Sequence, residues 1–313
     1  MIKISPAKFK RTLKVLLQNL PLYFHFCRSI RYLLHAFPRF SWIARLPIPV
    51  GLVVELYQNS NLIYLTNGVR CSIAKKIFWY RGIVYPIQDN IALSLFYSLS
   101  LSSTVIFDIG SNSGIFSLLA AKANPNSKII AYDILPEAVH ILTDNAIVNG
   151  LLSNIDISLV GVGIPNTFFQ APFFNVSSEM PSSLSLNTDV NSRLKVEVPV
   201  HSLDELCKPF FNHSVKLLIK IDVEGFEADI FRFGLKSLHE LSPAIICEIL
   251  LICQDLSFVD NILTANFYNK YLITDIGLVY FSIVFPHPVF KDWFFTKDKL
   301  DSIFNGFSVF YYY

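Results

Sequence analysis

The sequence lacks the features of several specialised classes of protein. Its five cysteines are scattered over 313 residues and form no CxxC pair, so we expect neither a disulfide framework nor a zinc site. A membrane span needs about 20 mostly apolar residues. The longest uncharged run near the middle, residues 90–107, contains five serines, and the apolar run at 276–290 is shorter and holds two prolines. No transmembrane helix is therefore expected.

The N-terminus lacks the apolar segment and small-residue cleavage site of a secretory signal. Together with the scattered cysteines, this indicates a reduced, cytoplasmic setting. Apolar residues make up 52% of the chain and charged residues only 16%, and the mean hydropathy is +0.45. This composition is too apolar for a disordered chain. We expect the apolar excess to fill a large core, or to face a membrane or a partner.

Acidic residues are absent from the first 54 positions, which hold nine of the 26 lysines and arginines. The remainder therefore carries 17 basic residues against 24 acidic ones. Basic residues interleaved with leucine and phenylalanine suit an anionic membrane surface, so residues 1–45 are a candidate for peripheral membrane contact. The alternative is a helical arm that packs on the core and leaves a solvated basic face. Nucleic acid is not expected, because aromatic stacking platforms normally belong to a formed domain.

Composition and patterning divide the chain into four regions. We expect a basic, apolar N-terminal arm at 1–50, a lead-in segment at 51–103, a main domain at 104–285 and a tail at 286–313. Within the main domain, residues 162–201 form an insertion rich in Phe, Ser, Asn and Pro. Long stretches of this kind inside compact domains are usually functional or disordered. We interpret this insertion, which includes Phe173 and Phe174, as a wall or lid over the carboxyl edge of the sheet.

Short apolar strands alternate with helical patterns from Thr104 onward, which is typical of a parallel α/β sheet covered on both faces. The expected strands are 104–107, 128–132, 155–160, 217–221 and 244–249, the expected helices are 114–123, 136–149 and 224–241, and a further strand is expected at 194–200. In the lead-in we expect strands at 53–57 and 62–66 and a helix at 91–101. The pattern predicts a Rossmann-like fold.

The first strand of this pattern runs into a glycine-containing turn, DIGSNSG, at residues 108–114. Glycines between a strand and a helix let the backbone approach a ligand, and the free N–H groups at the helix start then face it. Asp133 ends the next strand, where an acid can accept hydrogen bonds from both ribose hydroxyls. These features predict a site for an adenosine-containing ligand.

The turn favours S-adenosylmethionine over a dinucleotide. A dinucleotide turn would carry glycine where this chain has Asn112, between Gly110 and Gly114. Asp108 would also repel a pyrophosphate, whereas it suits a positively charged amino group. A nicotinamide-dependent oxidoreductase is therefore disfavoured. Asp133 could alternatively be a structural charge at the start of the following helix.

The fourth strand runs into a pair of acids, Asp222 and Glu224, within the segment KIDVEGFE. Ligands of such sheets bind at the carboxyl ends of the strands, so these acids are candidates for catalysis. A buried Asp222 would need a partner, and Lys220 or the substrate could supply it. Both acids could instead hold the turn before the helix, and Glu227 is favoured as a helix N-terminal acid. One pair of carboxylates is too little to predict a metal site.

These motifs resemble the FkbM family of S-adenosylmethionine-dependent methyltransferases over residues 105–249. The family motif D-x-G-A-N-x-G stands here as DIGSNSG at 108–114, and its acid-Pro motif as YDILP at 132–136, with Asp for the usual Glu and two residues inserted. The most specific match is LIKIDVEGFE at 218–227. Further matches are Asn145, NGL at 149–151, HSLD at 201–204 and PAIICE at 243–248.

The resemblance implies a class I methyltransferase fold and O-methylation of a hydroxyl on a sugar, glycan or related metabolite. Asp108, Gly110, Asn112, Gly114 and Asp133 would then bind S-adenosyl-L-methionine. An alcohol is a weak nucleophile, so a base near its proton would help, and we rank Glu224 slightly above Asp222 for this role. Two alternatives remain: a methyltransferase for a lipid or amine acceptor, and a non-catalytic, membrane-associated protein that binds the cofactor.

Overall fold

The computed structural model describes residues 16–20, 22–36, 46–66, 68, 70–84, 86–172 and 194–311. These residues divide into two compact units, with the division along the chain between Tyr85 and Pro86. Within the described residues, no helix is both long enough and apolar enough to cross a membrane. All five cysteines are free, and four of them are buried.

Where the structure describes it, the smaller unit contains a β-hairpin with helices on either side of it in the sequence. Its elements are α2 (Tyr23–Ala36), β1 (Val54–Gln58), β2 (Asn61–Leu65) and α3 (Ser72–Trp79). The hairpin is tight because Asn59 and Ser60 both adopt positive φ, as a two-residue turn between paired strands requires. The Tyr23 hydroxyl donates to the carbonyl of Pro47 at 2.9 Å, and the Trp79 indole N–H donates to the carbonyl of Leu46 at 3.0 Å. These bonds tie α2 and α3 to the same segment.

The larger unit contains a ten-stranded mixed sheet, with strand order β14-β15-β12-β11-β13-β10-β9-β3-β4-β5. Its parallel half consists of β10 (Ala244–Glu248), β9 (Leu217–Ile221), β3 (Val105–Ile109), β4 (Lys128–Asp133) and β5 (Ile155–Leu159). The other half consists of β11 (Asn269–Thr274), β12 (Gly277–Phe281), β13 (Asp292–Thr296), β14 (Ile303–Phe304) and β15 (Phe307–Tyr311). Both β3 and β9 are buried at every position, as continuous apolar strands predict.

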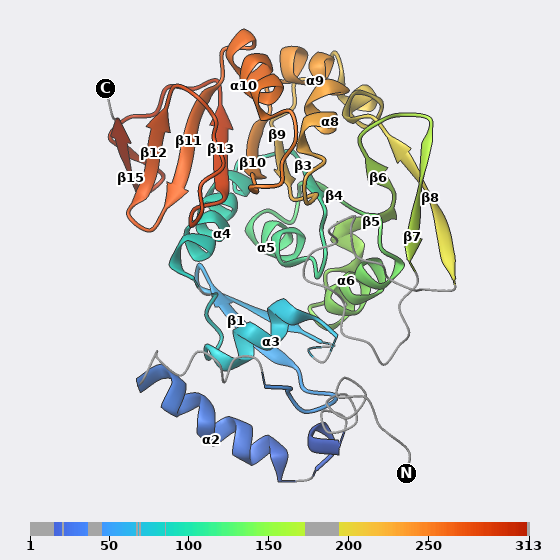
Figure 1. Cartoon of the computed structure of the whole chain (residues 1–313), viewed down its shortest axis with the longest axis vertical. Helices are drawn as coiled ribbons and strands as arrows, with labels where there is room; N and C mark the ends of the chain where they lie inside the picture. The colour runs from blue at the N-terminus through green and yellow to red at the C-terminus, as the bar shows by residue number, and fades with distance from the viewer. Residues whose placement is uncertain are drawn as a thin grey trace, which may run out of the picture. The chain divides into compact units, whose positions relative to one another are not determined.

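Helices cover both faces of this sheet. The helices are α4 (Ile87–Ser100), α5 (Ile115–Ala123), α6 (Pro136–Val148), α7 (Leu203–Cys207), α8 (Glu227–Arg232), α9 (Leu235–Glu240) and α10 (Leu256–Ala265). Figure 1 shows α5 and α6 on one face and α8 to α10 on the other. Side chains alternate along each strand, so Phe107 and Ile219 join the core beneath α8 to α10. The expected Rossmann-like fold with helices on both faces is confirmed.

The expectation of one helix over residues 224–241 is wrong. Glu224 and Gly225 have φ of 55° and 107°, so the chain turns before α8 begins at Glu227. A second break separates α8 from α9 at Gly234, where a Cβ would lie 2.7 Å from the Leu203 side chain. The start of α9 is capped from outside by Asp204, which accepts from the backbone N–H of Ser237 at 2.7 Å. A sequence pattern read along one segment cannot reveal a cap supplied by another.

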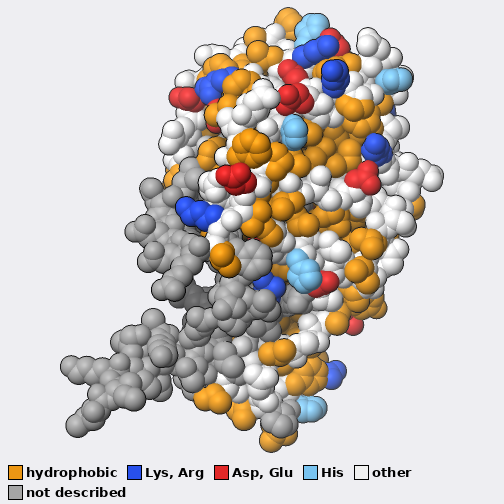
Figure 2. Space-filling model, turned by 90° about the vertical axis from the view of Figure 1, so that its right-hand side faces the viewer, with side chains coloured by type: hydrophobic (Ala, Val, Ile, Leu, Met, Phe, Trp, Pro, Cys, Tyr) orange, Lys and Arg blue, Asp and Glu red, His pale blue; other side chains and the backbone are white. Residues whose placement is uncertain are grey.

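The insertion at 162–201 contains a small separate sheet. Its strands are β6 (Gly161–Val162), β7 (Thr167–Pro172) and β8 (Lys195–His201), in the order β6-β8-β7. Figure 2 views the molecule from this side and shows hydrophobic side chains spread among polar ones. Phe168 and Leu194 are among the exposed apolar residues. Residues 173–193, including Phe173 and Phe174, lie outside the described residues.

Candidate functional site

The turn after β3 has the conformation that its glycines require. Gly110 and Gly114 both have φ of 79°, and Asn112 has φ of 49°. A Cβ on Gly110 would overlap the backbone oxygen of Asp222, and one on Gly114 would overlap the side chain of Leu142. Glycine is therefore needed at 110 and 114 for conformation and for space. The first of these contacts brings the glycine turn against the end of β9.

Asp133 holds this turn from the end of β4. Its two carboxylate oxygens accept from the backbone N–H groups of Asn112 and Leu135, each at 2.8 Å. Asp133 is 8% exposed, and burial raises its pKa to about 6 although the two N–H groups favour the charged form. The Asn145 side chain donates to the carbonyl of Ser113 at 2.9 Å, which fixes the turn from α6. The residues that resemble the family's motifs thus contact one another.

Asp108 lies deeper than the sequence suggested. It is 1% exposed, and its Oδ2 accepts from the backbone N–H and the hydroxyl of Ser117 at 3.0 and 2.6 Å. Burial raises the pKa of Asp108 to about 6, while the bonds from Ser117 and the nearby Lys220 ammonium oppose that rise. Asp108 therefore anchors the first turn of α5, directly behind the glycine turn.

The glycine turn fits the expected cofactor. The Ser111 hydroxyl is buried and has no hydrogen-bond partner among the described residues, so a ligand could supply one. The Asp133 carboxylate accepts one N–H at each oxygen and retains lone pairs for ribose hydroxyls. S-adenosylmethionine would thus be held by Ser111, Asp133 and the start of α5.

A second group of acids lies at the same edge of the sheet. Asp222, Glu224 and Glu248 each bring one carboxylate oxygen to within 4.8 Å of the others. We call these three residues the carboxylate cluster. Asp222 follows β9, Glu224 lies in the next turn and Glu248 ends β10. The structure therefore brings together the two predicted catalytic acids and adds Glu248, which the sequence analysis missed. Its position at the end of the strand next to β9 could have identified it.

Two lysines supply positive charge to the carboxylate cluster. The Lys220 ammonium lies 3.9 Å from Asp222 Oδ2 and 3.5 Å from Asp292 Oδ1. The Lys291 ammonium lies 3.9 Å from Glu248 Oε1. Because these ammonium groups already face the acids, we assign no metal ligand here.

Burial and mutual repulsion raise the pKa of two acids of this cluster, Glu224 and Glu248. Burial, together with the charge of Asp222, raises the pKa of Glu224 to about 7, while Lys291 opposes the rise. Burial and the charges of Asp222 and Asp292 raise the pKa of Glu248 as well. A carboxyl group that exchanges a proton near neutral pH, as Glu224 does, is suited to acid–base chemistry.

Glu227 has a structural position, as the sequence suggested. It is fully buried in the first turn of α8, and its Oε1 accepts from the backbone N–H of Gly225 at 3.0 Å. That bond stabilises the turn carrying Glu224.

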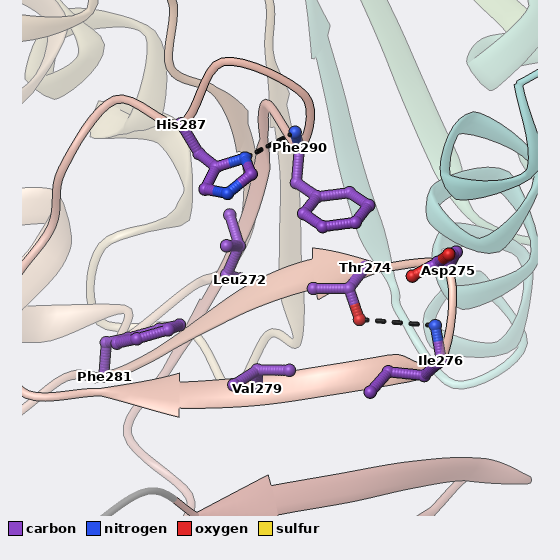
Figure 3. Close-up of a pocket in the computed structure, with 8 residues that line it drawn as sticks. All are labelled: Leu272, Thr274, Asp275, Ile276, Val279, Phe281, His287 and Phe290. Atoms are coloured by element: carbon purple, nitrogen blue, oxygen red, sulfur yellow. Dashed lines mark hydrogen bonds between the residues drawn. The ribbon is translucent and has the colours of Figure 1, made fainter.

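An apolar pocket of about 380 Å³ lies elsewhere in the larger unit (Figure 3). It is bounded by the β11–β12 hairpin and the loop before β13, and it is lined by Leu272, Thr274, Asp275, Ile276, Val279, Phe281, His287 and Phe290. Leu272 lies on the same face of the sheet as Lys270, and Lys270 bonds to α10, which covers that face. Lys220 points to the other face, where it contacts Phe116 of α5. The pocket thus opens on the face opposite Lys220, and no predicted site residue lines it.

Comparison with solved structures gives low-identity matches to methyltransferases. The FkbM methyltransferase of Methylobacillus flagellatus is 14% identical, with a TM-score of 0.43 over 71% of this chain and 52% of that chain. An O-methyltransferase of Bacillus cereus in complex with SAH is 11% identical, with a TM-score of 0.39 over 68% of this chain and 80% of that chain. A SAM-dependent methyltransferase of Agrobacterium tumefaciens is 9% identical, with a TM-score of 0.43 over 80% and 71%.

This chain spans about half the length of the Methylobacillus protein that it matches. No curated protein sequence matches it. The family model described as "Methyltransferase FkbM domain" matches residues 108–269, about half of the chain. That range begins at Asp108 of the glycine turn and includes Asp133 and the carboxylate cluster. The family expected from the motifs is therefore confirmed, and the chain belongs to the FkbM methyltransferase domain family.

Proposed function

We propose that this protein transfers the methyl group of S-adenosylmethionine to a hydroxyl of a sugar, a glycan or a related small metabolite. The contact between Gly110 and the backbone oxygen of Asp222 carries this proposal. It joins the candidate cofactor turn to the candidate catalytic acids at one edge of the sheet. A methyl donor and an acceptor must lie within reach of each other for direct transfer.

The cofactor supplies a methyl group on a positively charged sulfur. In our proposal, Asp133 accepts hydrogen bonds from the ribose hydroxyls, while Gly110, Asn112 and Gly114 shape the turn that surrounds the ligand. Asp108 contributes negative charge behind the turn, which favours the cofactor's amino group. These assignments use groups already fixed by hydrogen bonds, so little reorganisation accompanies binding.

The acceptor hydroxyl gives its proton to a Glu224 carboxylate oxygen while its own oxygen forms the new bond to carbon. The carbon–sulfur bond breaks in the same displacement. Because the pKa of Glu224 is about 7, a large share of this side chain is ionised at neutral pH and can accept the proton. Asp222 and Glu248 lie beside it and are suited to orienting the acceptor hydroxyl.

Charge-removing variants with conserved shape test this proposal. Glu224→Gln should lower turnover by about 10²–10⁴-fold, the usual size of a general-base contribution, with little change in cofactor affinity. Asp222→Asn should also lower turnover, and Glu240→Gln, on the exposed side of α9, is the matched control. Full turnover in both site variants, measured as methyl transfer to a panel of sugar, glycan, lipid and amine acceptors, would reject the catalytic assignment. The same panel separates the acceptor classes.

We also propose that the protein is cytoplasmic and makes peripheral contact with an anionic membrane. The described residues of the N-terminal region support it, because α2 buries Tyr23 and Cys27 and exposes Phe26 by 51%, while Leu22, just before α2, is 77% exposed. Arg28 is exposed on the same helix. Exposed apolar side chains near an exposed basic one in the sequence suit the interface of an anionic bilayer.

A further inference from the structure

Lys220 is a buried lysine in the middle of the parallel sheet. It is 2% exposed, and its neighbours in register are Asp108 on β3 and Ile246 on β10. The Phe116 ring of α5 lies 5.2 Å from its ammonium and closes one side. A buried ammonium loses most of its hydration, so hydrogen bonds or opposite charges must stabilise it.

Lys270, a second buried lysine of the same sheet, has a purely structural role and serves as a comparison. It is 3% exposed, and it donates to Asp260, Thr264 and the carbonyl of Ser282 at 2.6, 2.6 and 2.9 Å. All three of its N–H groups are thereby used. It joins α10 to the sheet, and none of its partners is a predicted site residue.

Lys220 is held differently. Its ammonium donates a hydrogen bond to the carbonyl of Ile221 at 3.1 Å. Its ammonium otherwise lies 3.5 Å from Asp292 and 3.9 Å from Asp222, so attraction between charges holds it more than direct bonding. Burial alone would lower the pKa of Lys220, but the carboxylates of Asp222, Asp292 and Glu248 outweigh burial and raise it. The side chain therefore stays charged.

We propose that Lys220 is a positioning residue for methyl transfer, and that its charge favours the ionised form of Glu224 and Glu248 beside the cofactor turn. This inference rests on the proposed function, since it concerns the same acids. The charged groups around Lys220 come from four strands: Asp108 from β3, Asp222 after β9, Glu248 from β10 and Asp292 from β13. Glu224, Lys291 and the Cys247 thiol of β10 also act on this group, and α5 contributes the ring of Phe116. Lys220 is thus the buried cation that these acids share.

The geometry gives two substitutions with opposite expected effects. Lys220→Met removes the cation, so the acids should become harder to ionise. Asp292→Asn removes a competing carboxylate while it keeps the shape, so the same acids should become easier to ionise. An opposite charge within about 4–6 Å typically moves a carboxyl pKa by 1–3 units. A residue that only supported the fold would lower stability without producing shifts of opposite sign.

The first test is the pH dependence of turnover in the full chain. We expect the acidic limb of the profile to move to higher pH in Lys220→Met. It should move down in Asp292→Asn. Lys270→Met, the matched control, should lower the melting temperature and leave the limb in place. Limbs that stay fixed, or that move the same way, in Lys220→Met and Asp292→Asn would overturn the proposal. If Lys220→Met does not fold, the proposal is tested by Asp292→Asn alone, and an acidic limb that does not move down in that variant would overturn it.

The second test needs no turnover, so it separates this inference from the proposed function. The side-chain carboxyl carbon of Glu248 can be followed by NMR in glutamate-labelled protein and assigned by its loss in Glu248→Gln. Its titration midpoint should rise in Lys220→Met and fall in Asp292→Asn. An unchanged midpoint in both variants would overturn the role of Lys220, even if the enzyme transfers methyl groups. The expected midpoints without methyl transfer to any acceptor would instead reject the proposed function alone.

Discussion

Gly110 lies directly against the backbone oxygen of Asp222, with no room between them for a Cβ. The backbone N–H of Asp222 also donates to the carbonyl of Ile109 at 2.9 Å, so the ends of β3 and β9 are joined at this point. The candidate cofactor turn and the candidate catalytic acids therefore form one rigid edge. A substitution at Gly110 should therefore also displace Asp222.

Gly110→Ala should disrupt both sites. The residue has φ of 79° and an alanine Cβ would overlap Asp222, so the ends of β3 and β9 must move apart. We expect a loss of several kcal/mol in the free energy of unfolding, as for other overpacked positions at special backbone angles. Gly150→Ala is the matched control, because Gly150 has φ of 68° but open space around it. It should cost only about 1–2 kcal/mol. Equal melting temperatures for the two variants would contradict this account.

Asp133→Ala should weaken binding of S-adenosylhomocysteine by about 1.5–3 kcal/mol, the range for hydrogen bonds to a charged group. Titration calorimetry measures this directly. Asp156→Ala, at an exposed position on neighbouring β5, should bind normally. If Asp133→Ala binds as tightly as the unchanged protein, Asp133 does not contact the cofactor.

Asp108→Asn should stabilise the protein without cofactor at pH 8. The pKa of Asp108 is raised from 3.8 to about 6, so its stabilising contribution is full below pH 4 and is lost as pH rises through 6. Above that range the buried charge costs up to about 3 kcal/mol, which asparagine avoids. The gain should be present at pH 8 and absent at pH 4, as measured by chemical unfolding. Affinity for S-adenosylmethionine should fall. A variant that is less stable at pH 8 would contradict the prediction.

Vesicle binding tests the exposed apolar residues at and just before the start of α2. Leu22→Ser with Phe26→Ser should reduce binding to anionic vesicles by more than tenfold, because each side chain contributes roughly 1.5–3 kcal/mol when buried. Phe267→Ser changes an equally apolar residue that is 83% exposed in the larger unit, and it should have no effect. Binding should also weaken as salt rises. Co-sedimentation that is equally strong with neutral vesicles, or absent with both kinds, would reject the membrane contact.

The parallel half of the fold could be predicted from the sequence because its information is local. Each strand is a short apolar run, so the predicted strand at 217–221 coincides with β9 and the others differ by one or two residues. The glycine turn could be predicted for the same reason, since Gly110, Asn112 and Gly114 lie within one segment and all adopt positive φ.

Contacts between distant segments could not be predicted from the sequence. Glu248 and Asp292 become neighbours only because β13 enters the sheet antiparallel to β10, pairing the two residues in register. Sequence patterning left residues 286–313 without a role, although β13 supplies Asp292 from that region. The break between α8 and α9 depends likewise on Asp204, which is about 30 positions away in the chain. Pairings of this kind depend on the assembled sheet.

The pH dependence of methyl transfer tests the account most directly. It should be measured with saturating S-adenosylmethionine for the unchanged protein and for Glu224→Gln. Because the pKa of Glu224 is about 7 and a base must be ionised to accept a proton, turnover should be low below pH 6 and rise to a plateau above pH 8. Glu224→Gln should be about 10²–10⁴-fold slower and should lose that rise. Turnover that is independent of pH over this range, or a Glu224→Gln variant with the full rate and the same profile, would contradict the assignment of Glu224 as the base.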